Sequence, residues 1–415
     1  MRFETLDLLR CPYCGGRLEL VTSSYHRRDD AEIHDGILGC HCCVFPVVAG
    51  IPVLHLLAGT STAREHIEAG EPDRALRAMF NLEDDEQAAR FDAVASSDSA
   101  TYRNLVDALG PNFEGGYFLY RFSDPTYVVA QAVVRAVAGT VLRGGGRAID
   151  ICGGSGHLTR SLLELSSETP VLADLYFAKI WLARRFTAPG CEPVCCDGNA
   201  PLPFARGAFR YAMCSDAFQY IWTKRQFVAE MVRLIGDDTA GAVVINHTHN
   251  QRTWSPSHGQ PLTPEGYRDL FETLEPRLFG ETGLLADVVK GGPLDLGRRD
   301  SGETLDADPA LTIVGTRRPD VFAPHRLAPP PSDARGELRV NPLYVLDSDA
   351  DPAGYRLRFP SEDYEQEYGA CRQYLPDRVT IDRASLAALD AGRLPSGLLD
   401  LARRRVIVDL PKNYY

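Results

Sequence analysis

Residues 148–156 read Ala-Ile-Asp-Ile-Cys-Gly-Gly-Ser-Gly, which is a buried-strand pattern followed by a glycine-rich turn and then by a helical pattern. A second apolar run, residues 170–173, ends at Asp174. Glycines allow a backbone to approach a bound ligand closely, and an acidic side chain after the neighbouring strand accepts hydrogen bonds from ribose hydroxyls. The two segments together predict a nucleotide-type cofactor site on a doubly wound sheet.

The chain has 415 residues, more than one ordinary domain core contains, and its patterns change several times along the sequence. Paired cysteines occupy residues 1–55, and residues 56–125 are charge-rich, with predicted helices at 63–79 and 84–94. Strand and helix patterns alternate over residues 126–317, which predicts an α/β domain with a mainly parallel, doubly wound sheet. A proline-rich linker at 318–337 and a small α+β tail domain at 338–415 complete the prediction. The tail has predicted strands at 339–346 and 355–359 and predicted helices at 383–389 and 398–405.

Hydrophobic periodicity gives the order of elements in the α/β domain. The predicted strands are residues 147–151, 170–174, 192–196, 211–214 and 241–246, with a closing antiparallel pair at 283–289 and 310–315. The predicted helices are residues 127–142, 156–165, 177–186, 224–235 and 264–274. The sheet is therefore expected to contain seven strands.

The glycine turn and the acid after the second strand resemble the S-adenosylmethionine site of class I methyltransferases. Residues 152–156 cover that family's Gly-x-Gly-x-Gly loop, with Cys152 in place of the first glycine. The resemblance implies the seven-stranded methyltransferase sheet and S-adenosylmethionine as cofactor. It also assigns cofactor contacts at the first two strand ends to Asp150, Gly153, Gly154, Ser155, Gly156, Asp174 and Leu175.

Two later segments match the same family. Residues 196–204 are similar to its Asp-Ala-x-x-Leu-Pro-Phe stretch, which implies that Asp197, beside Gly198, binds the adenine amino group. Residues 209–221 resemble the fourth-strand segment that lines the sulfonium, which implies a contact from Ser215. The segment departs from the family at Arg210, where an acid is usual.

Two further observations bear on the ligand. A dinucleotide site requires Gly-x-Gly-x-x-Gly, and Thr159 stands at its last position, which disfavours NAD or FAD. Residues 117–125 precede the first helix of the domain, where related methyltransferases have a lid, and Arg121 is a candidate for binding the methionine carboxylate. The same segment is also typical of a helix start, with Ser123 or Asp124 as the cap.

Two Cys-x-x-Cys pairs lie near the start of the chain. Four thiolates at such spacing predict a tetrahedral zinc site, and because four sulfur ligands leave no open position for a substrate, the zinc is expected to be structural. The predicted ligands are Cys11, Cys14, Cys40 and Cys43. His41 and Cys42 are alternative ligands from the second pair.

Residues 8–16 and 45–54 look similar to the zinc-ribbon activator family. These small proteins stabilise tRNA, rRNA and translation-factor methyltransferases by pairing a strand with them. The resemblance implies that a zinc ribbon over residues 1–55 is fused to the methyltransferase domain that it supports. The ribbon carries five Arg against seven Asp and Glu, which favours a docking role over nucleic-acid binding.

Polar side chains follow the fourth and fifth predicted strands, at the edge where α/β domains bind their substrates. His247 is the best candidate for a general base because the pKa of imidazole suits neutral pH, although a hydrogen-bonded loop histidine is the simpler interpretation. Asp216 and Tyr220 are the other catalytic candidates. His247 and His249 could also bind a metal, but the sequence indicates no third ligand.

The formal net charge of -12 argues against a large nucleic-acid-binding surface, which needs clustered Lys and Arg. Residues 1–10 show no secretory signal, so the eleven cysteines suggest reduced thiols and metal ligation. The best membrane candidate, residues 47–57, is too short to span a bilayer. We therefore expect a cytoplasmic protein with no membrane contact.

These expectations favour S-adenosylmethionine-dependent methyl transfer to a small molecule, such as a specialised metabolite. Two alternatives stay open. The zinc ribbon suggests an RNA or translation-factor methyltransferase, and a non-catalytic cofactor-binding scaffold would have the same cofactor motifs. The tail at 338–415 is expected to cap the active site, form a homodimer or bind a partner.

Overall fold

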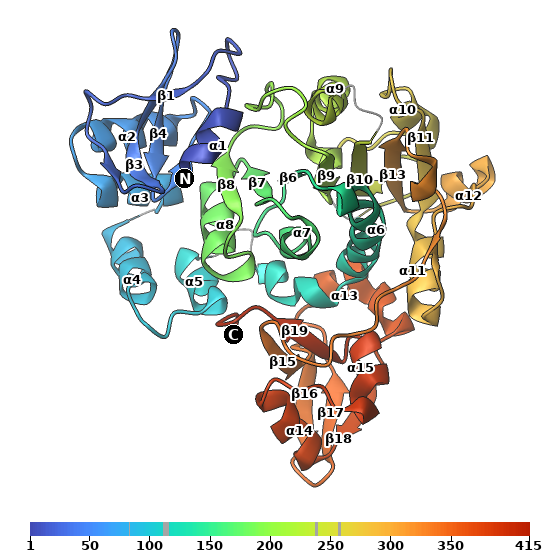
Figure 1. Ribbon diagram of the computed structural model, residues 1–415. Coiled ribbons are helices and arrows are strands. Elements are labelled where there is room, and N and C mark those ends of the chain that lie inside the picture. The colour runs from blue at the N-terminus through green and yellow to red at the C-terminus, as the bar shows by residue number, and fades with distance from the viewer. Residues whose placement is uncertain (83, 111–115, 237–239, 256–258) are drawn as a thin grey trace.

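The computed structural model describes residues 1–82, 84–110, 116–236, 240–255 and 259–415. The strands of its central sheet are β6 (Ala148–Ile151), β7 (Val171–Asp174), β8 (Glu192–Cys195), β9 (Tyr211–Ser215), β10 (Ala242–His249), β11 (Pro276–Gly280) and β13 (Ala310–Thr316). This mixed seven-stranded sheet has the order β11-β13-β10-β9-β6-β7-β8 (Figure 1). Neighbours from β8 to β10 pair in parallel, and β13 is antiparallel to β10 and β11. The predicted α/β fold with a seven-stranded sheet is confirmed.

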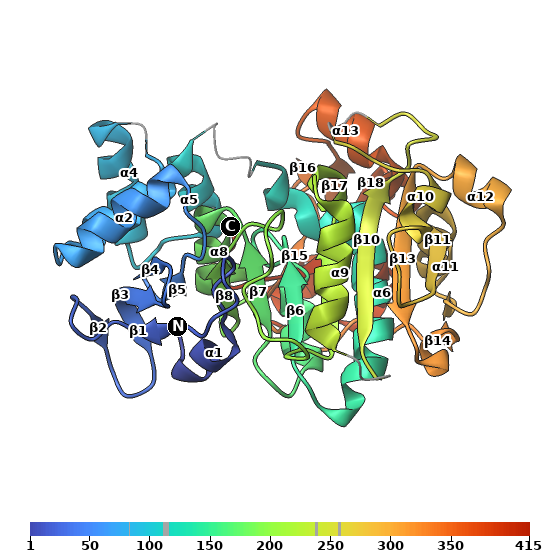
Figure 2. The same ribbon diagram turned by 90° about the horizontal axis from the view of Figure 1, so that it is seen from above.

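Helices cover both faces of this sheet. They are α6 (Pro125–Val141), α7 (Thr159–Leu165), α8 (Phe177–Leu182), α9 (Lys224–Ile235), α10 (Pro264–Arg268), α11 (Glu281–Lys290) and α12 (Gly302–Ala307). Figure 2 shows α6 and α9 on opposite faces. Helix α9 begins and ends at the predicted residues, and Gly236, at φ +70°, follows its last turn.

Two hydrophobic cores result because successive side chains of a strand point to opposite faces. In β6, Ala148 packs in the core formed with α6, α8 and α11, whereas Ile149 packs in the core formed with α9, α10 and the N-terminal region. By length and composition alone, Pro125–Gly144 is the one helix among the described residues that could cross a membrane. Its apolar window is 78% buried inside the protein, as expected for the core helix of an α/β domain.

The structure corrects three predicted elements. The predicted strand at 283–289 lies in helix α11, and the strand that pairs with β13 is β11. Leu284, Leu285 and Val288 belong to a largely apolar stretch that Asp287 interrupts, and at these spacings they form one face of a helix, which packs on the core. The predicted helix 63–79 is two helices, α2 (Ala58–Glu68) and α3 (Pro72–Phe80).

The third correction concerns the tail domain. The predicted strand 339–346 is divided into β15 (Glu337–Val340) and β16 (Tyr344–Ser348). The residues between them include Pro342, which lacks the N–H that a continuous ladder requires. The other tail elements are β17 (Ala353–Leu357), β18 (Arg378–Ile381), β19 (Ile407–Leu410), α13 (Glu362–Tyr368), α14 (Arg383–Asp390) and α15 (Leu399–Arg403). Strand β15 pairs with β19, and β17 lies between β16 and β18.

The N-terminal region is a small antiparallel sheet. Its elements are α1 (Phe3–Leu8), β1 (Glu19–Leu20), β2 (Arg27–Arg28), β3 (Ile33–Gly39), β4 (Val44–Val48) and β5 (Ile51–Pro52). Directly after β5, Val53 forms a parallel bridge with Cys195 of β8, and the Leu54 N–H donates to the Cys195 carbonyl at 2.7 Å. The N-terminal segment is thus hydrogen-bonded to the edge strand of the central sheet through an isolated bridge. Its role as an activator-type ribbon remains a prediction.

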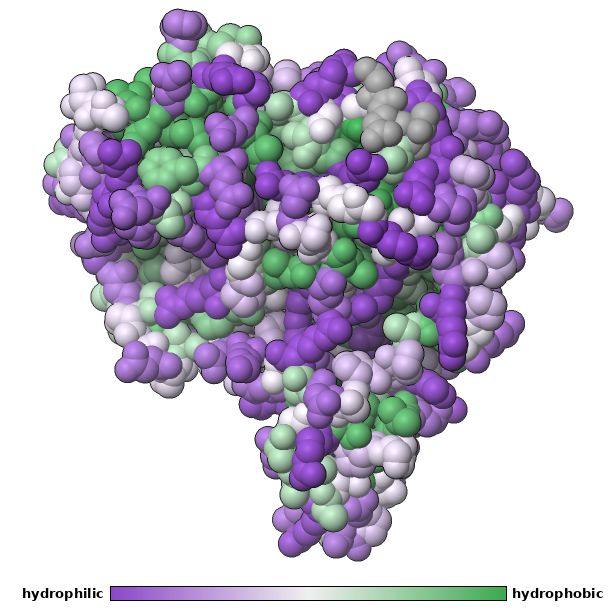
Figure 3. All heavy atoms as spheres, viewed as in Figure 1, coloured by the Kyte–Doolittle hydropathy of each residue, from purple (hydrophilic) through white to green (hydrophobic). Residues whose placement is uncertain are grey.

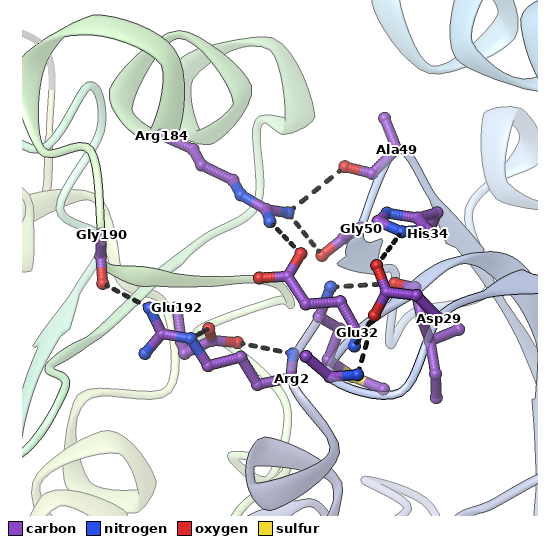
Figure 4. Close-up of polar contacts among 12 residues, drawn as sticks. Arg2, Asp29, Glu32, His34, Ala49, Gly50, Arg184, Gly190 and Glu192 are labelled. Carbon is purple, nitrogen blue, oxygen red and sulfur yellow. Dashed lines mark hydrogen bonds and ion pairs between the residues drawn. The ribbon is translucent and has the colours of Figure 1, made fainter.

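Charged side chains reinforce this contact (Figure 4). Arg184, beyond α8, forms an ion pair with Glu32 at 2.8 Å and donates to the Gly50 carbonyl at 3.1 Å. Arg2 pairs with the buried Glu192 of β8 at 3.2 Å. Figure 3 shows a largely hydrophilic surface, with hydrophobic residues gathered at the upper left, where Figure 1 places the N-terminal sheet.

Helices α4 (Asp85–Ala95) and α5 (Tyr102–Leu109) and the 3-10 helix η1 (Gly116–Ser123) connect the N-terminal sheet to α6. The short strands β12 (Leu294–Asp295) and β14 (Pro324–His325) pair with each other. Residues at the end of the chain hold η1 in place. The Tyr414 hydroxyl donates to the Phe118 carbonyl at 2.6 Å and lies 2.7 Å from His157 Nε2.

We predict that Tyr414→Phe lowers the free energy of unfolding by about 1–3 kcal/mol, because it leaves the buried Phe118 carbonyl and His157 Nε2 without this partner. Tyr414 is fully buried. Urea denaturation followed by circular dichroism measures the change, with the half-exposed Tyr25→Phe as the control. Equal stability of the two variants would contradict a structural role for this hydroxyl.

Candidate cofactor and acceptor site

The glycine loop follows β6 and is tightly packed. Cys152 has φ +59°, Gly154 has φ +54° and Gly156 has φ +73°, so the loop uses the left-handed conformation that glycine adopts readily. A Cβ atom on Gly153 would lie 2.6 Å from Cγ of Asp150, which leaves no space for a side chain there. The close approach of backbone that the sequence predicted is therefore present.

Asp150 supports this loop from β6. Its Oδ2 accepts a hydrogen bond from the Thr159 hydroxyl at 2.6 Å, whereas its Oδ1 is buried without a partner among the described residues. Burial raises the pKa of Asp150 to about 7. Because the Asp150 carboxyl packs directly against Gly153, its contact with the loop is structural.

Asp174 ends β7 beside the loop. Its Oδ2 accepts from the Gly154 N–H at 2.9 Å, and its Oδ1 accepts from the Tyr176 N–H at 2.8 Å. Burial raises the pKa of Asp174, and the Lys179 ammonium and these N–H groups oppose that rise. Two neighbouring strand ends thus present a glycine loop and a carboxylate that contact each other.

The other predicted cofactor residues also lie at carboxyl ends of strands. Leu175 follows β7, Asp197 and Gly198 follow β8, and Ser215 ends β9. Ser155 is fully buried within the glycine loop. Leu175, Asp197 and Ser215 are half-buried, whereas the strands before them are buried, so these residues line an edge that a ligand can reach.

Buried polar groups at this edge have no protein partner. The Ser215 hydroxyl and both side-chain atoms of Asn246 lack hydrogen bonds within the part of the chain that the structure describes. Ser215 and Asn246 are neighbours in register on β9 and β10. Because buried polar groups are normally satisfied, these atoms are suited to contact a polar ligand. The sequence analysis gave Asn246 no role, because it stands at the end of a predicted strand.

The predicted lid lies over the loop. A Cβ atom on Gly154 would be 3.3 Å from the Phe118 ring of η1, and that ring stacks on His157 with centroids 5.5 Å apart. Arg121, also in η1, forms buried ion pairs with Asp124 at 3.3 Å and with Asp216 at 3.0 Å. Its assignment to a methionine carboxylate remains a prediction.

His247 is held by a glutamate that the sequence analysis did not identify. Its Nδ1 lies 2.7 Å from Oε2 of Glu281, and its backbone N–H donates to Oε1 at 2.8 Å. Burial lowers the pKa of His247, but Glu281 more than offsets this and the pKa rises to about 9. No local pattern pairs these two residues, because Glu281 begins α11 after a different strand.

Asp216 and His249 complete a cluster with His247. The Oδ1 atom of Asp216 lies 4.0 Å from His247 Nε2, and the two imidazole rings are 5.5 Å apart, edge to face. Asp216 has φ +54° and His247 has φ +50°. Such conformations cost about 1–3 kcal/mol in non-glycine residues and gather at functional sites. Tyr220, the third predicted catalytic residue, is 48% exposed in the turn after β9.

Four cysteines of the N-terminal region form a cluster whose sulfur atoms suit one metal ion. Its members are Cys11, Cys14, Cys40 and Cys42, whose sulfurs all lie within 4.8 Å of one another. Three sulfur pairs are 3.6 to 3.8 Å apart, close to the spacing of about 3.8 Å that tetrahedral zinc with 2.3 Å bonds requires. The set therefore fits zinc.

Cys42 belongs to this set together with three of the predicted ligands, and the Cys43 sulfur lies 3.4 Å from the Cys42 sulfur. A tight turn between β3 and β4, closed by a 3.0 Å hydrogen bond from the Cys40 N–H to the Cys43 carbonyl, holds these cysteines together. The exposed Cys42 joins the other sulfurs. Sequence spacing alone favoured Cys43, because a Cys-x-x-Cys pair is the commoner arrangement.

We expect Cys43→Ser to retain one zinc ion per chain and Cys42→Ser to lose it, because only Cys42 belongs to the sulfur tetrad. Inductively coupled plasma mass spectrometry after dialysis against a weak chelator measures the zinc content. The opposite result, with zinc lost from Cys43→Ser alone, would restore the ligand set predicted from the sequence.

No protein-family model matches the chain, and no curated protein matches it. Solved structures with similar folds include the YcgJ protein of Bacillus subtilis, which is 16% identical with a TM-score of 0.33 and covers 48% of this chain and 100% of its own. A geranyl diphosphate C-methyltransferase from Streptomyces coelicolor A3(2) is 15% identical with a TM-score of 0.35, over 46% of this chain and 76% of its own.

A third similar chain comes from the complex that the Haloferax volcanii Trm112 methyltransferase activator forms with a proposed methyltransferase. It is 17% identical with a TM-score of 0.37, and the match covers 57% of this chain and 98% of that chain. These scores are too low to establish function, so the functional conclusion depends on the topology and site geometry described above.

Proposed function

We propose that the protein binds S-adenosylmethionine and transfers its methyl group to a small-molecule acceptor. The observation that carries this proposal is the contact between the Asp174 carboxylate and the Gly154 amide, 2.9 Å apart, at the carboxyl edge of the sheet. Strand β6 lies between β7 and β9, so connections leave it in both directions. In open α/β sheets ligands bind at this switch point.

The residues at this edge fit the cofactor. Asp174 would bind the ribose hydroxyls, Asp197 the adenine amino group, and Leu175 would pack beside the adenosine. The unpartnered atoms of Ser215 and Asn246 would face the polar methionine part. When bound, the cofactor supplies an electrophilic methyl group on sulfur, and the protein's main contribution is alignment of an acceptor with that group.

The acceptor would lie at the ends of β9 and β10, next to Asp216 and His247. The segment η1 and the aromatic side chains of α13 lie close to this region, since Tyr120 and Tyr364 are in ring contact at 5.6 Å. The net charge of -12 favours a small molecule over RNA. The general-base role of His247 and the catalytic role of Tyr220 remain predictions.

We propose a structural role for the zinc ribbon in the same protein. Its contacts with β8 at Val53 and Leu54 lie on the edge of the sheet opposite β11, away from the cluster at Asp216 and His247. The ribbon would therefore stabilise the sheet and its cofactor edge without touching the acceptor. Localisation in the cytoplasm is part of this proposal.

Calorimetric titration with S-adenosylhomocysteine tests the proposed function. We expect binding by the zinc-loaded protein, and binding at least about tenfold weaker in Asp174→Ala, because hydrogen bonds to a charged group contribute about 1.5–3 kcal/mol. The exposed Asp98→Ala is the matched control and should bind as the unmodified protein does. Absence of binding by the folded, unmodified protein would refute the cofactor assignment.

A further inference from the structure

The cluster at the ends of β9 and β10 contains a set of metal-ligating atoms. Asp216, His247 and His249 each offer one ligand atom, and these atoms lie within 4.8 Å of one another. A register shift between Ile245 and Thr248 in the pairing of β10 with β13 brings the backbone of His247 out of the regular ladder. The bulge turns His247 toward Asp216 on the neighbouring strand.

Both imidazoles are oriented through Nδ1, as metal-ligating histidines usually are. Glu281 holds Nδ1 of His247 at 2.7 Å, and the Ser255 hydroxyl lies 3.1 Å from Nδ1 of His249. The Nε2 atom of His247 faces Asp216, and the Thr126 hydroxyl lies 3.4 Å from this atom, at the long end of hydrogen-bond distance. The Glu281 carboxylate is itself fixed, since Oε1 also accepts from Thr312 at 2.8 Å.

The distance between Asp216 and His247 suits a shared ion. A separation of 4.0 Å between Oδ1 and Nε2 is too long for a hydrogen bond. Two ligands that are each about 2.1 Å from one metal ion lie about 3 to 4 Å apart. The cluster therefore needs little rearrangement to become a first coordination shell.

Charges around the cluster favour a cation. The carboxyl groups of Asp124 and Asp216 face the guanidinium of Arg121, whereas that of Glu281 pairs with His247. Arg121 binds Oδ2 of Asp216, so the Oδ1 atom, which also accepts from Gln219 at 3.3 Å, is the one directed toward the histidines. A divalent cation would balance the excess of carboxyl groups.

We propose that Asp216, His247 and His249 bind a divalent first-row transition metal ion, which holds an oxygen of the acceptor. Two imidazoles and one carboxylate suit such ions and leave coordination positions open for a hydroxyl or carboxylate oxygen. The site would lie between the cofactor edge and the acceptor. The role of the metal in holding the acceptor rests on the proposed function, whereas metal binding itself does not.

The test is a titration of the zinc-loaded full chain with Mn2+, followed by the electron paramagnetic resonance signal of free Mn2+. Mn2+ prefers oxygen and imidazole ligands to thiolates, so the cysteine tetrad does not compete. We expect one bound Mn2+ per chain, at least about tenfold weaker binding in His249→Gln, and about 10–100-fold weaker binding in Glu281→Gln. His34→Gln, at an exposed histidine of the N-terminal sheet, is the control and should leave the affinity unchanged.

Circular dichroism shows whether each variant is folded, and because this control does not depend on S-adenosylhomocysteine binding, the result stays separate from the cofactor proposal. If His249→Gln does not fold, pulsed electron paramagnetic resonance of the unmodified protein tests whether imidazole binds the metal ion. Nitrogen couplings from imidazole to Mn2+ would support the site, and their absence would overturn it. Failure of the unmodified protein to bind Mn2+ at millimolar concentration, or equal binding by both variants and the control, would also overturn it.

Discussion

Strand β6 is hydrogen-bonded in parallel to β7 on one side and to β9 on the other, and the arrangement of the whole site depends on this pairing. It brings the glycine loop after β6 between Asp174 on β7 and Asp216 after β9. Because parallel strands end at the same edge, residues distant in the sequence meet there without any long loop. The orphaned polar atoms of Ser215 and Asn246 lie along the same edge.

Both ends of the chain are attached to this sheet. Near the start, Val53 and Leu54 extend the edge at β8, and Arg184 and Arg2 add ion pairs (Figure 4). At the end, Tyr414 fixes the carbonyl of Phe118, whose ring covers the glycine loop. The two ends of the chain therefore hold the elements around the cofactor edge in place. Neither end supplies a predicted cofactor contact.

Local patterns predicted the fold well where one residue type settles the conformation. Glycine at 154 and 156, the acid at 174 and the periodicity of α9 were all placed correctly by sequence. The errors came where two conformations satisfy the same local pattern. The apolar residues of α11 fit a strand or a helix, and packing against the core decided for the helix.

By itself the sequence determined the α/β class, the glycine loop with its acid, and the cysteine pairs, because these depend on residues close together in the chain. The partners of His247 were decided only by the tertiary structure. The sequence predicted that Asp216 and His247 share one edge of the sheet, but nothing in the local sequence places Glu281 beside the same imidazole. Strand order and the bulge in β10 bring them together, and both are properties of the packed sheet.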